Sequence, residues 1–210
     1  KPFSYLFESV EGGEKWARYS LIGLPSSRVI KVYKNQIKIF NNGKIEEEIT
    51  SSDPLKFLED YQDSIKVKLY DHLPAFTGGL VGYLGYDCIR YIEPKLSHSN
   101  LPDPLGTPDA LFMVSEEVAV FDNLNNKLHL IVLSESESGA DICKAEERLK
   151  VLSEKLGKPL TYETSEKIGE SATENDFVSG FGEKEFKETV EKVKEYIKAG
   201  DVMQEVCSQR

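Results

Sequence analysis

Residues 3–23 read FSYLFESVEGGEKWARYSLIG, a pattern that is typical of a β-hairpin. Aromatic residues alternate with other residues over 3–8, and aromatic and apolar residues mix with polar ones again over 16–22. Gly12 and Gly13, between the two runs, give the backbone the freedom that a tight turn needs. We therefore expect the chain to open with two antiparallel strands.

Three polar side chains of this hairpin form a candidate binding site. Glu8 contributes a carboxylate, Ser9 a hydroxyl and Arg18 a guanidinium, all close to aromatic residues. Such a set can hold an amino-acid zwitterion, with its carboxylate on Arg18 and its ammonium on Glu8, beside an apolar pocket for the side chain. The alternative is a solvated ion pair next to a core hairpin. Composition alone favours this alternative, because most exposed ion pairs do no specific work.

The composition of the whole chain excludes several classes of function. The 210 residues carry a formal net charge of −10, which argues against a nucleic-acid partner, and no polybasic cluster suits an anionic membrane. No apolar run approaches the ~20 residues that cross a bilayer, so a cytoplasmic protein is the default expectation. The three cysteines and three histidines are scattered without metal-ligand spacing, which predicts reduced thiols and no zinc site.

The rest of the chain mixes strands and helices. Alternating patterns over 28–33, 37–40 and 45–50 predict an antiparallel meander, and Asp53 before Pro54 predicts the start of a helix. Further strands are expected over 109–121 and 127–133, and further helices over 142–156 and 182–199. The regular alternation of a parallel, doubly wound sheet is missing. The predicted class is therefore α+β, with antiparallel sheets packed with helices.

Four glycines between Phe76 and Asp87 do not have the spacing of a dinucleotide-binding loop. We interpret them as positions where a strand packs closely against another backbone. Asp87 and Arg90, three residues apart, are expected to pair on the turn that follows. The acidic run 46–48 is interpreted as a solvated strand edge. With no nucleophile and base motif, phosphate loop or metal cluster, the residues alone indicate an α+β domain with a candidate small-molecule pocket.

Four motifs, in order along the chain, resemble the large subunit of anthranilate synthase, component I. They are LFES at 6–9, GGEKWARYSLIG at 12–23, GGLVGYLGYD at 78–87, and AGDVMQ with SQR within 199–210. The resemblance covers the N-terminal half of that subunit. The chain departs from the family pattern at Phe7, where Leu is usual, and at Glu205 and Cys207, where apolar residues are common.

The resemblance implies an enzyme of tryptophan biosynthesis. This family converts chorismate and ammonia to anthranilate and pyruvate with Mg2+, and takes the ammonia from a glutamine amidotransferase small subunit, so a hetero-oligomer is expected. The residues that hold Mg2+ and chorismate belong to motifs beyond the position of Arg210. By resemblance, therefore, neither catalytic residues nor metal ligands lie in this chain, and the chain alone is expected to be inactive.

The resemblance also implies a feedback site for L-tryptophan beside the LFES motif. The residues it assigns to that site are Leu6, Glu8, Ser9, Arg18 and Tyr19. It implies a regulatory α+β domain over 1–160, a linker over 161–181 and the start of a catalytic domain over 182–210, truncated at its end. Because the chain begins without Met and ends inside a strand-like run, 202–209, we expect it to be a piece of a longer protein.

Three alternatives remain open. The large subunit of aminodeoxychorismate synthase, in folate synthesis, uses the same substrate and tends to have Asp where this chain has Glu8. A stand-alone ligand-binding module would lack a catalytic partner domain. A structural domain that docks the amidotransferase would also fit the acidic composition, although no specific residue supports it.

Overall fold

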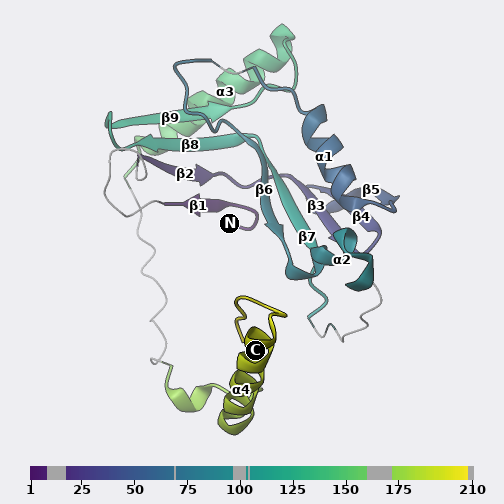
Figure 1. Ribbon diagram of the computed structural model, residues 1–210. Helices are drawn as coiled ribbons and strands as arrows, with labels where there is room; N and C mark the ends of the chain where they lie inside the picture. The colour runs from purple at the N-terminus through teal and green to yellow at the C-terminus, as the bar shows by residue number, and fades with distance from the viewer. Residues whose placement is uncertain (9–17, 69, 97–102, 104, 160–171, 208–210) are drawn as a thin grey trace. The chain divides into compact units, whose positions relative to one another are not determined.

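The computed structural model describes residues 1–8, 18–68, 70–96, 103, 105–159 and 172–207 (Figure 1). The chain divides into two compact units, Lys1–Pro159 and Leu160–Arg210. The first unit contains two antiparallel sheets with helices, so the predicted α+β class is confirmed. Within the described residues, none of the helices combines the length and the apolar character that crossing a bilayer requires.

The opening hairpin belongs to a four-stranded sheet with the order β1-β2-β8-β9. Strands β1 (Tyr5–Phe7) and β2 (Tyr19–Gly23) pair antiparallel, as the alternating pattern predicts, and Leu6 lies opposite Ile22. Strand β8 (Glu117–Asp122) pairs with β2, and β9 (Lys127–Val132) pairs with β8 at the other edge of the sheet. Strand β1 is therefore an edge strand. Gly12 and Gly13, the predicted turn, lie outside the described residues.

The second sheet has five strands in the order β5-β4-β3-β7-β6. The predicted meander forms its first three strands, β3 (Arg28–Tyr33), β4 (Gln36–Asn41) and β5 (Lys44–Thr50). Strands β6 (Gly79–Leu84) and β7 (Ala110–Ser115) complete it on the other side of β3. Strand β3 thus lies at the centre of the sheet.

The prediction of a single strand over 109–121 is wrong. The structure divides this run at Glu116 into β7 and β8, which belong to different sheets. Both halves are mostly apolar, and the polar run 115–117 lies where the strand breaks. The prediction overlooked this run. The crossing is held together by Tyr5 of β1, whose hydroxyl shares a 2.8 Å hydrogen bond with that of Ser115, the last residue of β7.

Helix α1 (Pro54–Ser64) covers one face of the five-stranded sheet, where buried Leu58 packs among Ile30, Val32 and Ile39. Its start is the predicted one, because a carboxylate oxygen of Asp53 accepts a 2.9 Å hydrogen bond from the Lys56 backbone N–H. The short elements η1 (Tyr86–Cys88), α2 (Ile89–Ile92) and η2 (Pro94–Leu96) follow β6. The predicted pair in this region is confirmed, with Arg90 Nη2 at 2.8 Å from a carboxylate oxygen of Asp87.

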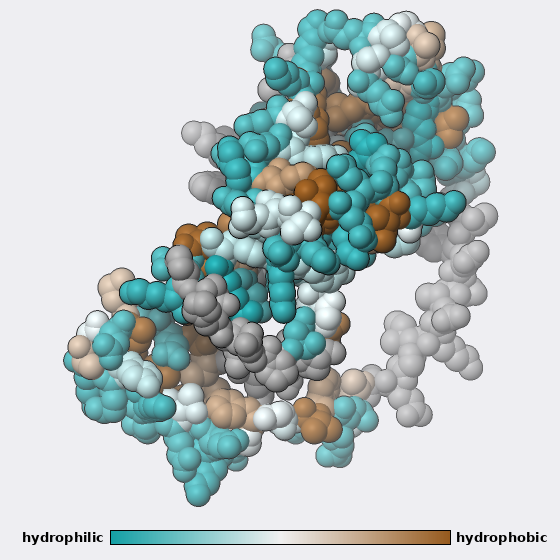
Figure 2. Space-filling model, turned by 90° about the vertical axis from the view of Figure 1, so that its right-hand side faces the viewer, coloured by the Kyte–Doolittle hydropathy of each residue, from teal (hydrophilic) through white to brown (hydrophobic). Residues whose placement is uncertain are grey.

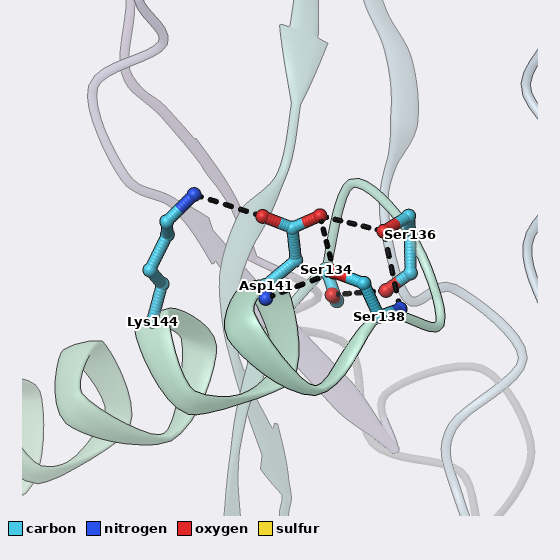
Figure 3. Close-up of polar contacts among 5 residues, drawn as sticks. All are labelled: Ser134, Ser136, Ser138, Asp141 and Lys144. Carbon is cyan, nitrogen blue, oxygen red and sulfur yellow. Dashed lines mark hydrogen bonds and ion pairs between the residues drawn. The ribbon is translucent and has the colours of Figure 1, made fainter.

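Helix α3 (Gly139–Leu156) lies beside β9 and begins at a network of serines (Figure 3). The Ser138 hydroxyl accepts a hydrogen bond from the Asp141 backbone N–H, which caps the helix. The Asp141 carboxylate accepts from the hydroxyls of Ser136 and Ser138 and, at 2.8 Å, from Lys144 Nζ. Lys144, together with these hydroxyls, holds the pKa of Asp141 well below its usual range.

The glycine-rich strand has the role that its spacing predicts. A Cβ atom on Gly82 would lie 1.8 Å from the carbonyl oxygen of Leu111 in the neighbouring β7. Only a residue without a side chain lets the two backbones approach this closely. Gly78 and Gly85 also lie close to a neighbouring backbone oxygen, so these three glycines serve packing. Gly79 has no atom within 4 Å of an added Cβ, and its φ of 127° indicates a conformational role instead.

In the second unit, the 3-10 helix η3 (Glu174–Asp176) precedes α4 (Glu183–Ala199). Helix α4 ends at Gly200, whose φ of 82° is the left-handed conformation that favours glycine. A strand is expected over 202–209. Residues 202–207, the part of it that the structure describes, do not form a strand. Met203 is 97% exposed and Glu205 is also exposed, so the burial cost that a strand would impose on Glu205 does not arise.

Candidate functional site

Strand β1 presents two faces with different surroundings. Tyr5 points inward, where its ring fills the space beside Gly23 and its centroid lies 5.0 Å from that of Phe7. Leu6 is 59% exposed, and Glu8, two positions further along, is also exposed. Leu6 lies on the face of β1 opposite to Tyr5, and Glu8 is the residue directly after the strand. Ser9 lies outside the described residues.

Arg18, at the start of the second hairpin strand, is paired with a residue 104 positions away. Its Nε and Nη2 donate hydrogen bonds of 3.1 and 2.8 Å to the two carboxylate oxygens of Asp122. The side chain of Asp122 is only 4% exposed and that of Arg18 is 35% exposed. Within the described part of the chain, no ion pair joins Arg18 to Glu8.

The Asp122 carboxylate is satisfied from a second side. The backbone N–H and the side-chain amide of Asn125 donate to it at 3.2 and 2.8 Å. The hydrogen bonds from Arg18, supported by those from Asn125, hold the pKa of Asp122 well below its usual range. Arg18 and Asp122 thus form a bidentate, charge-assisted ion pair, which joins the hairpin to the turn between β8 and β9.

Tyr19 contacts both the Arg18 guanidinium and the hydrophobic core. Its Cα is in register with that of Asp122 across β2 and β8, and its ring packs against the core cluster that includes Val118 and Val120. The Arg18 guanidinium lies 4.7 Å from the Tyr19 ring centroid, a cation–π distance. Tyr19 therefore helps to fix Arg18 as well as the strand.

The structure thus separates the predicted site residues into two groups. Arg18 and Tyr19 both contact or face Asp122, while Leu6 of β1 and Glu8, just after it, are exposed. Asp122 itself is absent from the sequence prediction. The only sequence signal for it was its place at a strand end before the polar run 122–126. The described residues include no group of three or more His, Cys, Asp or Glu side chains that could hold a metal ion.

Comparison with known proteins identifies the class. The sequence pattern of chorismate-binding enzymes matches residues 5–210, so the chain belongs to this family. Its relatives are, more specifically, component 1 of anthranilate synthase. The chain is 47% identical to the Pseudomonas putida protein over 211 residues and 43% identical to that of Neisseria meningitidis serogroup B over 213 residues.

These alignments include all of this chain but 43% and 42% of the two relatives, so the chain spans less than half of their length. The crystal structure of anthranilate synthase component I from Streptococcus pneumoniae TIGR4 is similar at a TM-score of 0.60 and 26% identity. That similarity covers 94% of this chain and 41% of the other. The predicted resemblance to component I is confirmed. The assigned tryptophan-site residues and the functional division of the chain stay predictions.

Proposed function

We propose that this chain is the tryptophan-sensing, N-terminal part of an anthranilate synthase component I. The observation that carries the proposal is the identity of 47% to the Pseudomonas putida component 1 along the whole chain. The parent enzyme would convert chorismate and ammonia to anthranilate and pyruvate, in the cytoplasm. The ammonia would come from an amidotransferase subunit in a hetero-oligomer.

The chemistry of the reaction is proposed to lie outside these 210 residues. Mg2+ prefers several oxygen ligands in a near-octahedral arrangement. The described residues do not fit this requirement, because they offer no acidic cluster of that kind. From the resemblance to the family, we propose that the metal ligands and the catalytic residues come from another part of the enzyme, and that the chain alone has no turnover.

The outer face of β1 is the proposed place for L-tryptophan. The Glu8 carboxylate would accept the ligand's ammonium group, Ser9 would donate its hydroxyl, and Leu6 would contact the indole ring. Arg18 would offer the ligand carboxylate only the N–H groups that Asp122 leaves free, since a guanidinium has five donors. The main role proposed for Arg18 and Tyr19 is therefore to hold the second strand of the hairpin, beside the site, in position.

Bound tryptophan would inhibit by favouring an inactive conformation of the enzyme. A ligand shifts such an equilibrium only by its difference in affinity for the two conformations. The specific alternative is aminodeoxychorismate synthase. The names of the relatives favour anthranilate synthase over it.

The test is a product assay on the intact polypeptide that contains this chain. It is incubated with chorismate, Mg2+ and ammonium, with and without L-tryptophan, and the product is identified by mass. Anthranilate and pyruvate, suppressed by tryptophan, support the proposal. Aminodeoxychorismate assigns the protein to the alternative, and no product supports a non-catalytic module.

A further inference from the structure

The five-stranded sheet has two faces with different environments. On one, Ile30 and Val32 of β3 are buried under α1. On the other, Val29 packs with Val81 and Met113 in a second core cluster. Lys31, two residues further along β3 and on this same face, places an ammonium group on the central strand of the sheet.

Lys31 has aromatic neighbours but lacks a carboxylate partner. Its Nζ lies 4.9 Å from the ring centroid of Phe40 and 5.7 Å from that of Phe3. Within the described residues, no Asp or Glu forms an ion pair with it. Lys38, its direct cross-strand neighbour on β4, differs, because Lys38 Nζ lies 3.0 Å from a carboxylate oxygen of Glu48. The Lys31 ammonium therefore lies near the rings of Phe3 and Phe40, and no carboxylate of the described residues pairs with it.

A hollow of about 560 Å³ opens beside this lysine. Its walls include Phe3, Val29, Phe40 and Asn42, and its charged lining residues are Lys1 and Lys31, with no Asp or Glu. Phe3 has a φ of 56°, which a bulky L-residue rarely adopts, and its carbonyl accepts a 2.9 Å hydrogen bond from the Ser26 backbone N–H. Strained residues of this kind gather at ligand sites.

We propose that this hollow binds a small aromatic monocarboxylate. The carboxylate would pair with the Lys31 ammonium, and the ring would lie against Phe3, Phe40 and Val29. An aromatic acid fits better than an amino acid, because the lining offers no carboxylate for an ammonium group. The volume is within the range of small-molecule pockets and leaves ample room for one ring. This site is separate from the proposed tryptophan site and does not depend on it.

The test is a titration of the 15N-labelled chain with benzoate, followed by amide chemical shifts, with neutral benzamide as the matched ligand. Saturable shifts at Val29, Lys31 and Phe40 are expected for benzoate, and weaker binding for benzamide. Lys31→Met should weaken benzoate binding by roughly tenfold or more, since a charged hydrogen bond is lost. Lys31→Arg should retain binding, and the control Lys38→Met should bind as the wild type does.

Equal affinity for benzoate in Lys31→Met and the wild type would overturn the proposal. So would equal affinity of the wild type for benzoate and benzamide, or shifts that do not saturate or that fall outside the hollow. The dispersion of the amide spectrum shows in each variant whether the sheet is still folded. A loss of binding in Lys31→Met with a native spectrum is the supporting result.

Discussion

The Arg18–Asp122 pair shows how one pair of residues fixes the hairpin. Its two short hydrogen bonds join β2 to the end of β8, and Asn125 completes the shell around the carboxylate. Asp122 is nearly buried whereas Arg18 is partly exposed, so removal of Arg18 would leave a buried carboxylate without its main partner, which is costly. The pair therefore holds the second strand of the hairpin in register, next to the proposed site.

This pair predicts how stability depends on pH. Because the pKa of Asp122 is lower in the folded chain than its usual value of about 3.9, the pair stabilises the fold above that pH. The contribution is lost as pH falls through the lower, folded-state pKa. Asp122→Asn should therefore lower the melting temperature at pH 7, and its difference from the wild type should shrink below about pH 4.

Thermal melts between pH 3 and pH 7 provide the measurement. Asp60→Asn is the control, since Asp60 belongs to an exposed pair with Lys56 that should contribute little. A difference between Asp122→Asn and the wild type that stays the same at pH 3 and pH 7 would contradict this account of the pair.

At the scale of elements, the sheets show which features could be predicted and why. The meander and helix α1 were predictable because their alternation, turn residues and cap are all local. The position of the break between β7 and β8 has a local signal in the polar run 115–117, but the sheet that each half joins has none. The hairpin itself was predictable from local alternation, whereas the edge position of β1 and the pairing of Arg18 with Asp122 were not.

Strand β6 gives a direct test of its glycine packing. Gly82→Ala places a Cβ atom 1.8 Å from the Leu111 carbonyl oxygen, so the two backbones must move apart. Overpacking of this kind costs about 1–3 kcal/mol or more of unfolding free energy. Gly139→Ala, at the start of α3, has no atom within 4 Å of the new Cβ and should be neutral or stabilising. Urea unfolding of both variants measures the difference, and equal midpoints would refute the packing role of Gly82.

At the scale of the molecule, the core lies almost entirely in the first unit. The three hydrophobic clusters and the two sheets found among the described residues fall within Lys1–Pro159. Among the described residues of the second unit, one apolar residue, Val193, is buried. On the surface turned toward the viewer in Figure 2, hydrophobic residues form small patches in a mostly hydrophilic area. The first unit therefore contains what a stable domain needs.

A truncated chain tests this independence. Residues 1–159 should fold alone and unfold cooperatively, because every strand keeps its partners. Near-UV circular dichroism and thermal melts of residues 1–159 and of the whole chain provide the comparison. If residues 1–159 lose their near-UV signal or unfold without a cooperative transition, the first unit is not an independent domain.

The most direct test of the central claim is tryptophan inhibition of the intact enzyme that contains this chain. Glu8→Ala and Ser9→Ala should each raise the inhibitory concentration of L-tryptophan roughly ten- to a hundred-fold while largely sparing turnover. The reason is that a lost charged hydrogen bond costs roughly 1.5–3 kcal/mol of binding. Glu47→Ala, which removes an exposed carboxylate from β5, is the control and should be inhibited like the wild type. Unchanged inhibition in both hairpin variants would show that tryptophan is not sensed at β1.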